Sequence, residues 1–348
     1  MSAGRRCALL VAALGSAACI APMSPSYSEN VTPTVLATAS SAGVRDLRGA
    51  YREAVCRRLP AAGPPCDQVL LELGAETPAP AAEPRPGAAQ RYRIGFVPGL
   101  YSECFDAIAR PFAGPMADLT RAGFAVHHLP VSGRGSNADN AERLARGLAL
   151  LPPDPRPFIL FAYSKGLPDV LTMLASRPDV APSIAAVVSV AGAMNGSPLA
   201  DRLNAVFRVW FSTLPLPSCG MGDGDEIFDL RREARLRWWN EHREQIKTPV
   251  FALVTTPRED RVSPILREMY DELAKIDPRN DGQLIWYDQI APGGSLLGYV
   301  NADHWGVALA VSPALPGLGL LFRADVPRTA LVEAAIEVVD AALAAESR

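Results

Sequence analysis

Residues 158–166 read Phe158-Ile159-Leu160-Phe161-Ala162-Tyr163-Ser164-Lys165-Gly166. An uninterrupted apolar run predicts a strand buried on both faces, and a helical pattern follows it over residues 170–175. Ser164 is therefore expected at a sharp strand-to-helix turn, where the small residues Ala162 and Gly166 allow close packing. Such a turn exposes the hydroxyl of a nucleophile beside a helix N-terminus, although a serine can also cap a helix without doing chemistry.

Short apolar runs alternate with helical patterns on both sides of this stretch. The expected strands are 93–97, 124–129, 158–161, 184–190, 250–254 and, as the last one, 283–287. Helices are expected between them, and a final helix is expected over residues 326–345. We therefore predict an α/β fold with a mostly parallel twisted sheet and helices on both faces. Ligands bind such sheets outside the carboxyl ends of the strands.

A serine needs a base to take its proton, and histidine is the usual one. His304 lies in a loop, residues 301–306, between the last expected strand and the final helix. It is our candidate for the base, and the alternative is a loop histidine that only hydrogen-bonds the backbone. The remaining histidines are interpreted as packing or surface residues: His127, His128 and His242.

A third group must orient the imidazole and stabilise its charged form. Asp260 follows the expected strand 250–254, so it should lie at the same edge of the sheet as Ser164. We predict Asp260 as this acid, with a salt bridge to Arg258 or Arg261 as the alternative use of its carboxylate. The reserve candidates are Glu259, Asp303 and Asp201.

The negative oxygen formed on attack needs two fixed N–H donors. One is expected from the backbone of Lys165, directly after the serine. The loop after the first main-domain strand contains Gly99, which permits a tight turn, and Leu100 is positioned to supply the second donor. The alternative for this loop is an ordinary turn before a helix.

The composition excludes several classes of protein. The 348 residues are 49% hydrophobic and 20% charged, so the chain can bury a large core and is not a disordered one. The net charge of −3 comes without a long basic run, which argues against nucleic acid as a partner. Cysteines and histidines do not occur at zinc-site spacing, and we expect neither a metal nor an organic cofactor.

The first 19 residues resemble an export signal. Arg5 and Arg6 precede an apolar run over residues 7–14, and small residues lead to Cys19. The signal could be processed in two ways: Cys19 could be lipidated, as in bacterial lipoproteins, or the chain could be cleaved nearby without lipidation. A membrane anchor is disfavoured because a spanning helix needs about 20 apolar residues. We expect a protein of the bacterial cell envelope, periplasmic or lipid-anchored, or a secreted one.

Export to an oxidising compartment favours disulfide bonds among the four remaining cysteines. Three pairings are possible. A bond between Cys56 and Cys66 fits a helical hairpin around a proline-rich turn, and it would leave Cys104 with Cys219. The alternative is four buried thiols.

The chain divides by composition into several segments. A helical N-terminal element is expected over residues 20–76, followed by a Pro/Ala-rich linker over 77–90 and a main domain over 91–348. Residues 195–247 are interpreted as a cap over the pocket. The aromatic and aliphatic residues expected to line it or pack under it are Phe207, Trp210, Phe211, Leu214 and Leu216.

Together these features resemble the α/β-hydrolase superfamily over residues 91–348. The order Ser164, Asp260, His304 is the order of nucleophile, acid and base in that family. Residues 195–201 look like the segment that leads into the cap of bacterial lipases and esterases. The chain departs from the common pattern with Pro98 before Gly99, with Ala162 in the turn and with the charged Lys165.

The resemblance implies an exported serine hydrolase that cleaves carboxylic esters of lipid-like or other apolar acyl groups through an acyl-enzyme. The same machinery could serve acyl transfer or the cleavage of amides or thioesters. A different class is a non-catalytic binding protein that keeps the fold. Fluorophosphonate labelling of Ser164 would separate this class from the enzymes.

Overall fold

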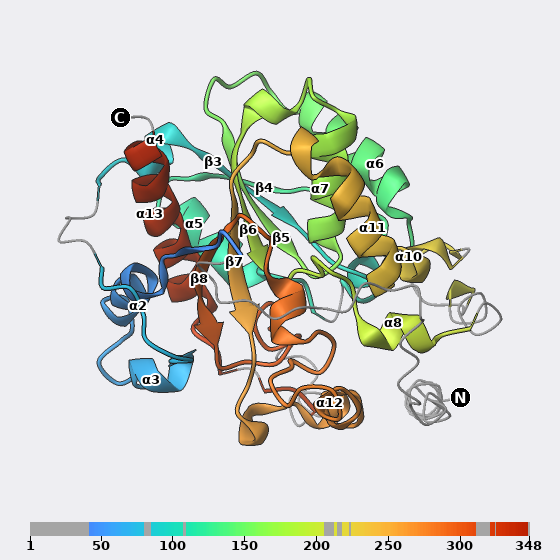
Figure 1. The fold of residues 1–348 in the computed structure, drawn as a ribbon. Helices are drawn as coiled ribbons and strands as arrows, with labels where there is room; N and C mark the ends of the chain where they lie inside the picture. Colours follow the sequence, from blue (N-terminus) through green and yellow to red (C-terminus); the bar gives the residue numbers. More distant parts are fainter. Residues whose placement is uncertain are drawn as a thin grey trace, which may run out of the picture.

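The computed structural model describes residues 42–79, 85–106, 109–204, 212–213, 218–222, 224–310, 321–323 and 325–346. An eight-stranded sheet forms its centre, with seven strands in the order β1-β8-β7-β6-β5-β3-β4 and β2 paired to β8 (Figure 1). Only the β2–β8 pair among them is antiparallel. The strands are β1 Arg45–Asp46, β2 Leu70–Leu71, β3 Arg93–Val97, β4 Ala125–His128, β5 Phe158–Tyr163, β6 Ile184–Val190, β7 Val250–Thr255 and β8 Ser295–Val300.

Helices cover both faces of the sheet. On one face α13 packs against α2 and α5, and on the other α6 packs against α7, with α11 beside them (Figure 1). The α-helices are α2 Arg48–Cys56, α3 Cys66–Val69, α4 Ala88–Arg91, α5 Ala113–Arg121, α6 Asn137–Ala149, α7 Gly166–Ser176, α8 Pro198–Arg202, α10 Asp225–Phe228, α11 Arg232–His242, α12 Arg267–Ala274 and α13 Arg328–Glu346. This architecture confirms the predicted fold class.

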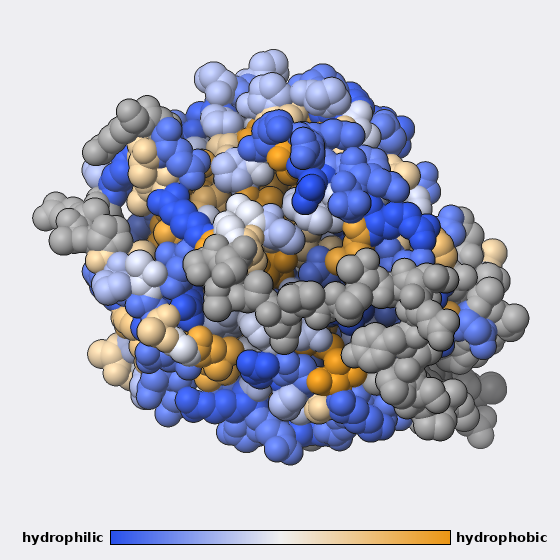
Figure 2. Space-filling view, viewed as in Figure 1, coloured by the Kyte–Doolittle hydropathy of each residue, from blue (hydrophilic) through white to orange (hydrophobic). Residues whose placement is uncertain are grey.

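The central strands are apolar because they are buried on both faces. Every residue of β5 is buried, and so is all of β6 except one position. The core is accordingly split into two main clusters, one under α13 and α2 and the other under α6 and α7. Figure 2 shows that hydrophilic residues cover most of this face of the molecule. Apolar residues are visible in a hollow near its middle.

The last strand was predicted at the wrong place. Residues 283–287 do not form a strand; they belong to a loop that runs into a short 3₁₀ helix, η7 Trp286–Gln289. Their apolar character has another cause, since Leu284 and Ile285 are buried within this irregular segment. The true last strand is β8, whose pattern is interrupted by Gly298. A Cβ atom there would lie 3.1 Å from the ring of Tyr51, so glycine gives α2 room to pack closely against the strand.

Residues 42–76 join the main sheet, whereas a separate helical element was expected. β1 pairs with β8 in parallel and β2 pairs with it in antiparallel fashion. Tyr51 of α2 is fully buried, and its hydroxyl donates to the carbonyl of Leu331 in α13. Residues 20–41 of the expected element and 80–84 of the expected linker lie outside the described residues.

Both expected disulfide bonds are present. Cys56 is bonded to Cys66, and Cys104 is bonded to Cys219. The second bond joins the short helix η2 Ser102–Phe105, after β3, to residues 218–222 of the expected cap.

Several other expectations fall on residues outside the described part. These are the export signal with Cys19 and the cap residues Phe207, Trp210, Phe211, Leu214 and Leu216. The described part of residues 195–247 contains α8, α10 and α11. Within the described residues, no helix is both long and apolar enough to span a membrane.

Candidate active site

The turn between β5 and α7 holds Ser164 in a strained backbone conformation. Its φ angle is 54°, in the left-handed region that residues other than glycine rarely adopt. Hydrogen bonds fix it from both sides: its N–H donates to Val190 in β6, and its carbonyl accepts from Leu167 and Ala193. The residue is buried but retains 8% exposure, so the predicted sharp turn is formed and its serine has limited access to solvent.

Close packing requires two glycines here, Gly166 at the start of α7 and Gly99 in the loop after β3. A Cβ atom on Gly99 would lie 2.7 Å from that of Ser164, and one on Gly166 would lie 2.6 Å from the carbonyl oxygen of Pro98. The loop after β3 therefore lies directly against the serine turn. Leu100 directly follows Gly99 in this loop.

His304 lies between the serine and a carboxylate. Its Nε2 atom is 2.9 Å from the Oγ of Ser164, and its Nδ1 atom is 2.8 Å from Oδ2 of Asp281. The ring is only 1% exposed. The His304 carbonyl accepts from the Tyr163 hydroxyl, and the His304 N–H donates to the carbonyl of Asp281, so the loop is held by its backbone as well.

The acid was predicted wrongly: the partner of His304 is Asp281, not Asp260. Asp260 follows β7 directly in the short helix η5 Glu259–Arg261, but its side chain is exposed. It lines a separate hollow of about 250 Å³ together with residues such as Arg258, Arg261 and Asn301. Proximity to the end of the strand therefore did not bring this carboxylate to the imidazole. The alternative, a salt bridge of Asp260 with Arg258 or Arg261, is also not formed in the described part of the chain, where Arg261 pairs with Asp325.

Asp281 comes from an irregular segment between α12 and β8. It is fully buried, and its Oδ2 accepts from the hydroxyl of Thr255 at 2.6 Å and from the amide of Gln289 at 3.3 Å, besides facing His304. Oδ1 accepts two backbone N–H bonds, from Gln283 and Leu284. The carboxylate is thus compensated by several donors, which is what a buried charge requires. The available sequence signal was the turn-forming pair Asp281-Gly282.

The reserve acids and the other histidines lie elsewhere. Asp303 accepts from the N–H groups of Ser263 and Gly306 and so shapes the His304 loop, while Asp201 accepts from Arg232 and Glu259 pairs with Arg267. His242 stacks on Trp238, and His127 packs against Phe158. Burial lowers the pKa of His127 and of His128.

The two expected oxyanion donors remain available. In the described residues, neither the N–H of Leu100 nor that of Lys165 has a backbone acceptor. Leu100 also belongs to an apolar cluster that joins the ends of the strands to the expected cap. Its other members are Ala193, Ala200, Leu203, Ile227, Leu230 and Leu284.

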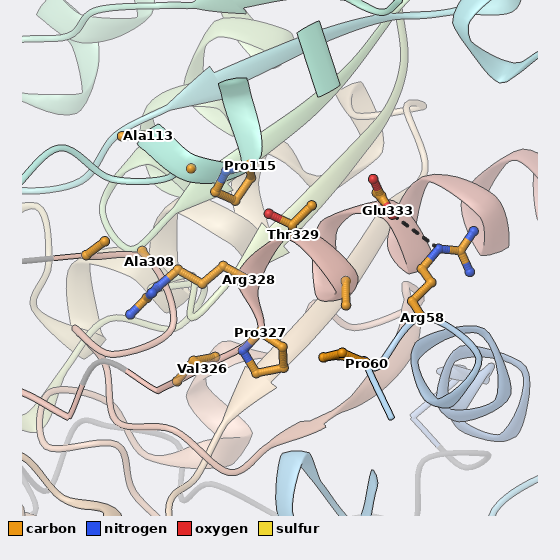
Figure 3. A pocket seen from close by; sticks show the side chains of 13 residues that line it. Arg58, Pro60, Ala113, Pro115, Ala308, Val326, Pro327, Arg328, Thr329 and Glu333 are labelled. Carbon is orange, nitrogen blue, oxygen red and sulfur yellow. Dashed lines mark ion pairs between the residues drawn. The ribbon is translucent and has the colours of Figure 1, made fainter. Parts of the chain in front are cut away.

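A groove of about 360 Å³ lies at a different place, where the start of α13 meets α5 and the end of α2 (Figure 3). Arg328 is at one side of it and the Arg58–Glu333 ion pair, with 3.6 Å between Nε and Oε2, is at the other. Its lining does not include Ser164, His304 or Asp281. Within the described residues, no group of three or more His, Cys, Asp or Glu side chains could hold a metal ion.

Comparison with known proteins places the chain in a family. No protein-family model and no curated protein matches it. The structure is similar to that of the metagenomic carboxyl esterase MGS0156, with 37% sequence identity and a TM-score of 0.82 over 90% of this chain and 97% of the esterase. The chain belongs to the α/β-hydrolase superfamily, among its lipase- and esterase-like members.

More distant structures share the fold of this α/β-hydrolase. The Staphylococcus hyicus lipase is 12% identical with a TM-score of 0.52 over 77% of this chain and 99% of the lipase. EstA from Clostridium botulinum is also 12% identical with a TM-score of 0.52, over 85% of this chain and 99% of EstA. At this identity the likeness concerns the fold alone.

Proposed function

We propose that this α/β-hydrolase cleaves carboxylic esters, with Ser164 as the nucleophile, His304 as the general base and Asp281 as the residue that orients His304. The observation that carries the proposal is the continuous contact from Ser164 Oγ to His304 Nε2, 2.9 Å, and from His304 Nδ1 to Asp281 Oδ2, 2.8 Å. A carboxylate only accepts hydrogen bonds, so Nδ1 carries the proton and Nε2 is free to accept one from the serine.

The reaction follows from these contacts. Ser164 Oγ attacks the ester carbonyl while its proton passes to Nε2, and the imidazolium that forms faces the Asp281 carboxylate. The N–H groups of Leu100 and Lys165 stabilise the tetrahedral oxyanion. His304 then returns the proton to the departing alcohol, which leaves an acyl group on the serine. Water, activated by the same histidine, releases the acid and restores the hydroxyl.

An apolar acyl group suits the surroundings of the serine. The cluster around Leu100 contributes aliphatic side chains from the loop after β3, from α8 and from the segment that carries Asp281. The esterase and lipase neighbours act in the same chemical class. The two disulfide bonds fit an exported protein, and we include export in the proposal.

The test compares the carboxylate that faces His304 with the carboxylate predicted from the sequence. Hydrolysis of p-nitrophenyl esters of graded chain length is measured for the wild type, Ser164→Ala, Asp281→Asn and Asp260→Asn, together with fluorophosphonate labelling. Ser164→Ala should abolish labelling, and Asp281→Asn should lower kcat by roughly 10³–10⁴-fold. Asp260→Asn is the matched control and should keep kcat within about twofold, because its carboxylate lies in a separate hollow. Labelling of Ser164→Ala, or equal loss in both aspartate variants, would overturn the proposal.

A further inference from the structure

The side chain of Lys165 is not explained by the role of its backbone N–H. Lysine is almost never fully buried unless it is paired, yet this side chain is only 1% exposed. Its ammonium group is 2.6 Å from Oδ1 of Asp169, one helical turn further along α7, and that carboxylate is equally buried. A buried ion pair therefore begins at the residue directly after the serine.

The ion pair continues into α6. The second oxygen of Asp169 accepts from Nδ2 of Asn140 at 2.9 Å, and Asn140 is fully buried. The same amide clamps the loop after β4: its Oδ1 accepts from the N–H of Ser132 at 2.8 Å, and its Nδ2 donates to the Ser132 carbonyl at 3.0 Å. Each polar group of the Asn140 side chain therefore has a partner within this network.

The loop after β4 in turn holds the loop after β3. The Gly133 carbonyl accepts from the N–H of Tyr101 at 2.9 Å, and Glu103 accepts from the Gly133 N–H at 3.0 Å and from the Ser132 hydroxyl. The packing is so close that a Cβ atom on Gly133 would lie 2.8 Å from Cα of Tyr101. Tyr101 directly follows Leu100, so the network starts at one proposed oxyanion donor and ends beside the other.

We propose that Lys165, Asp169 and Asn140 form a positioning network that fixes the two oxyanion donors relative to each other. The inference rests on the proposed function and deepens it. The three side chains need not touch the substrate, because they act through the backbone of residues 100–101 and 165. Small displacements matter at this point, since donors must match the position of the oxyanion and a shift of about 1 Å can cost 10²-fold in rate.

The energetics favour positioning over stability as the role of the ion pair. Burial raises the pKa of Asp169 to about 6, against the attraction of Lys165, so keeping this carboxylate ionised is costly. Replacing a buried ion pair with apolar residues of similar size is often neutral or stabilising. A network kept only for stability should therefore be replaceable without loss of activity.

The test measures kcat, KM and the Ki of an alkyl trifluoromethyl ketone, which forms a tetrahedral adduct with the serine. The variants are Asp169→Asn, Asn140→Ala and the double variant Lys165→Met/Asp169→Leu, and Tm is recorded for each. The control is Asp340→Asn, which removes a carboxylate that is 2% exposed and paired with Arg91 on the other face of the sheet. We expect kcat to fall 10- to 100-fold in the three network variants, KM to stay within about twofold and Ki to rise by the same factor as kcat falls. Asp340→Asn should change Tm but leave kcat and Ki near their wild-type values.

The outcomes separate the network from the proposed function. If the wild type is not labelled at Ser164 by a fluorophosphonate, the proposed function fails and the inference with it. If the wild type is labelled but the network variants keep kcat and Ki, only the inference is overturned. A double variant with wild-type Tm and full activity overturns it as well, as does a rise in KM at constant kcat. Should a single variant fail to fold, the double variant decides.

Discussion

At the scale of single residues, Ser164 shows how the site is built at the expense of local stability. A φ angle of 54° puts its backbone in a conformation that costs a non-glycine residue about 1–2 kcal/mol. The turn persists because Val190 of β6, Leu167 of α7 and Ala193 all hold it by backbone hydrogen bonds. The hydrogen bonds of the surrounding elements therefore maintain the strained backbone of Ser164.

The strain leads to a prediction with a matched pair of variants. Ser164→Ala and Ser164→Gly both lose the hydroxyl, but only glycine adopts the left-handed conformation without a steric cost. We expect Ser164→Gly to be more stable than Ser164→Ala by about 1 kcal/mol in the free energy of unfolding, measured by urea denaturation. Equal stability of the two variants, or a less stable glycine variant, would contradict the strain argument.

The same residues explain what could be predicted from the sequence. Ser164, Gly99 and His304 stand in local patterns whose geometry is fixed by their immediate neighbours: a strand, a turn and a loop before a helix. Asp281 stands only beside a turn-forming glycine, Gly282, and that pair does not fix its position. Its segment lies between α12 and β8 and is held by tertiary contacts with Thr255 and Gln289. The rule that the acid follows a strand directly selected Asp260, and no local signal could show that Asp260 is exposed.

At the scale of elements, helix α11 is tied to the segment that follows Asp281. Arg232, at the start of α11, donates to Asp288 of η7 at 3.0 Å, and that carboxylate is fully buried. Burial raises the pKa of Asp288 to about 7, although Arg232 opposes the rise. A carboxyl with a raised folded-state pKa favours folding while it is protonated, and this contribution is lost as the pH rises from about 4 through 7.

This sign gives a measurable pH dependence. The asparagine of Asp288→Asn cannot ionise. The free energy of unfolding of this variant therefore does not fall with rising pH through the ionisation of residue 288. Relative to this variant, the wild type should become less stable between pH 4 and pH 8, by up to about 4 kcal/mol. Urea denaturation of both proteins across this range checks the prediction, and parallel stability curves would contradict it.

The Cys104–Cys219 bond makes a second prediction at the same scale. It connects η2, next to Leu100 and Tyr101, with residues of the expected cap. Cys104→Ser/Cys219→Ser, like a strong reductant, should loosen this contact and lower kcat several-fold. Cys56→Ser/Cys66→Ser removes the other bond as a control and should lower Tm while leaving kcat of the folded protein near the wild-type value. Unchanged kinetics in the first pair would show that the bond does not support the site.

The elements also show where periodicity was sufficient. β3, β6 and β7 begin and end within a residue of their predicted positions because continuous burial leaves a continuous apolar run. β8 was missed because Gly298 interrupts its apolar pattern, whereas the buried pair Leu284 and Ile285 imitated a strand. An apolar run in the sequence indicates that a segment is buried. It does not indicate that the segment hydrogen-bonds to a neighbouring strand.

At the scale of the whole molecule, residues 42–76 belong to the same core as the main domain. They cover one edge of β8 with β1 and β2, and they seal the face of α13 with Tyr51. The compositional boundary near residue 90 therefore separates two parts of one sheet. Composition predicted a linker but could not reveal that the segments on both sides of it pair with β8.

A shortened chain tests this integration. A protein that starts at Arg91 would expose the edge of β8 together with the apolar surface left by Tyr51. Exposed edges and apolar patches promote aggregation, so we expect it to be insoluble or oligomeric in size-exclusion chromatography. Removing only residues 1–41 is the comparison and should leave a monodisperse protein that retains fluorophosphonate labelling. A well-folded monomer from the Arg91 start would contradict the single-core description.

The position of Asp281 has a further consequence for recombining this chain with its relatives. Asp281 and His304 both lie in the stretch from the start of β7 to the start of α13, and Thr255 and Gln289 lie in it as well. A crossover between β6 and β7 would thus transfer Asp281, His304 and the side chains that support them as one block, while the serine turn stays with the other parent. Chimeras joined there should preserve the contacts around His304 better than those joined between α12 and β8.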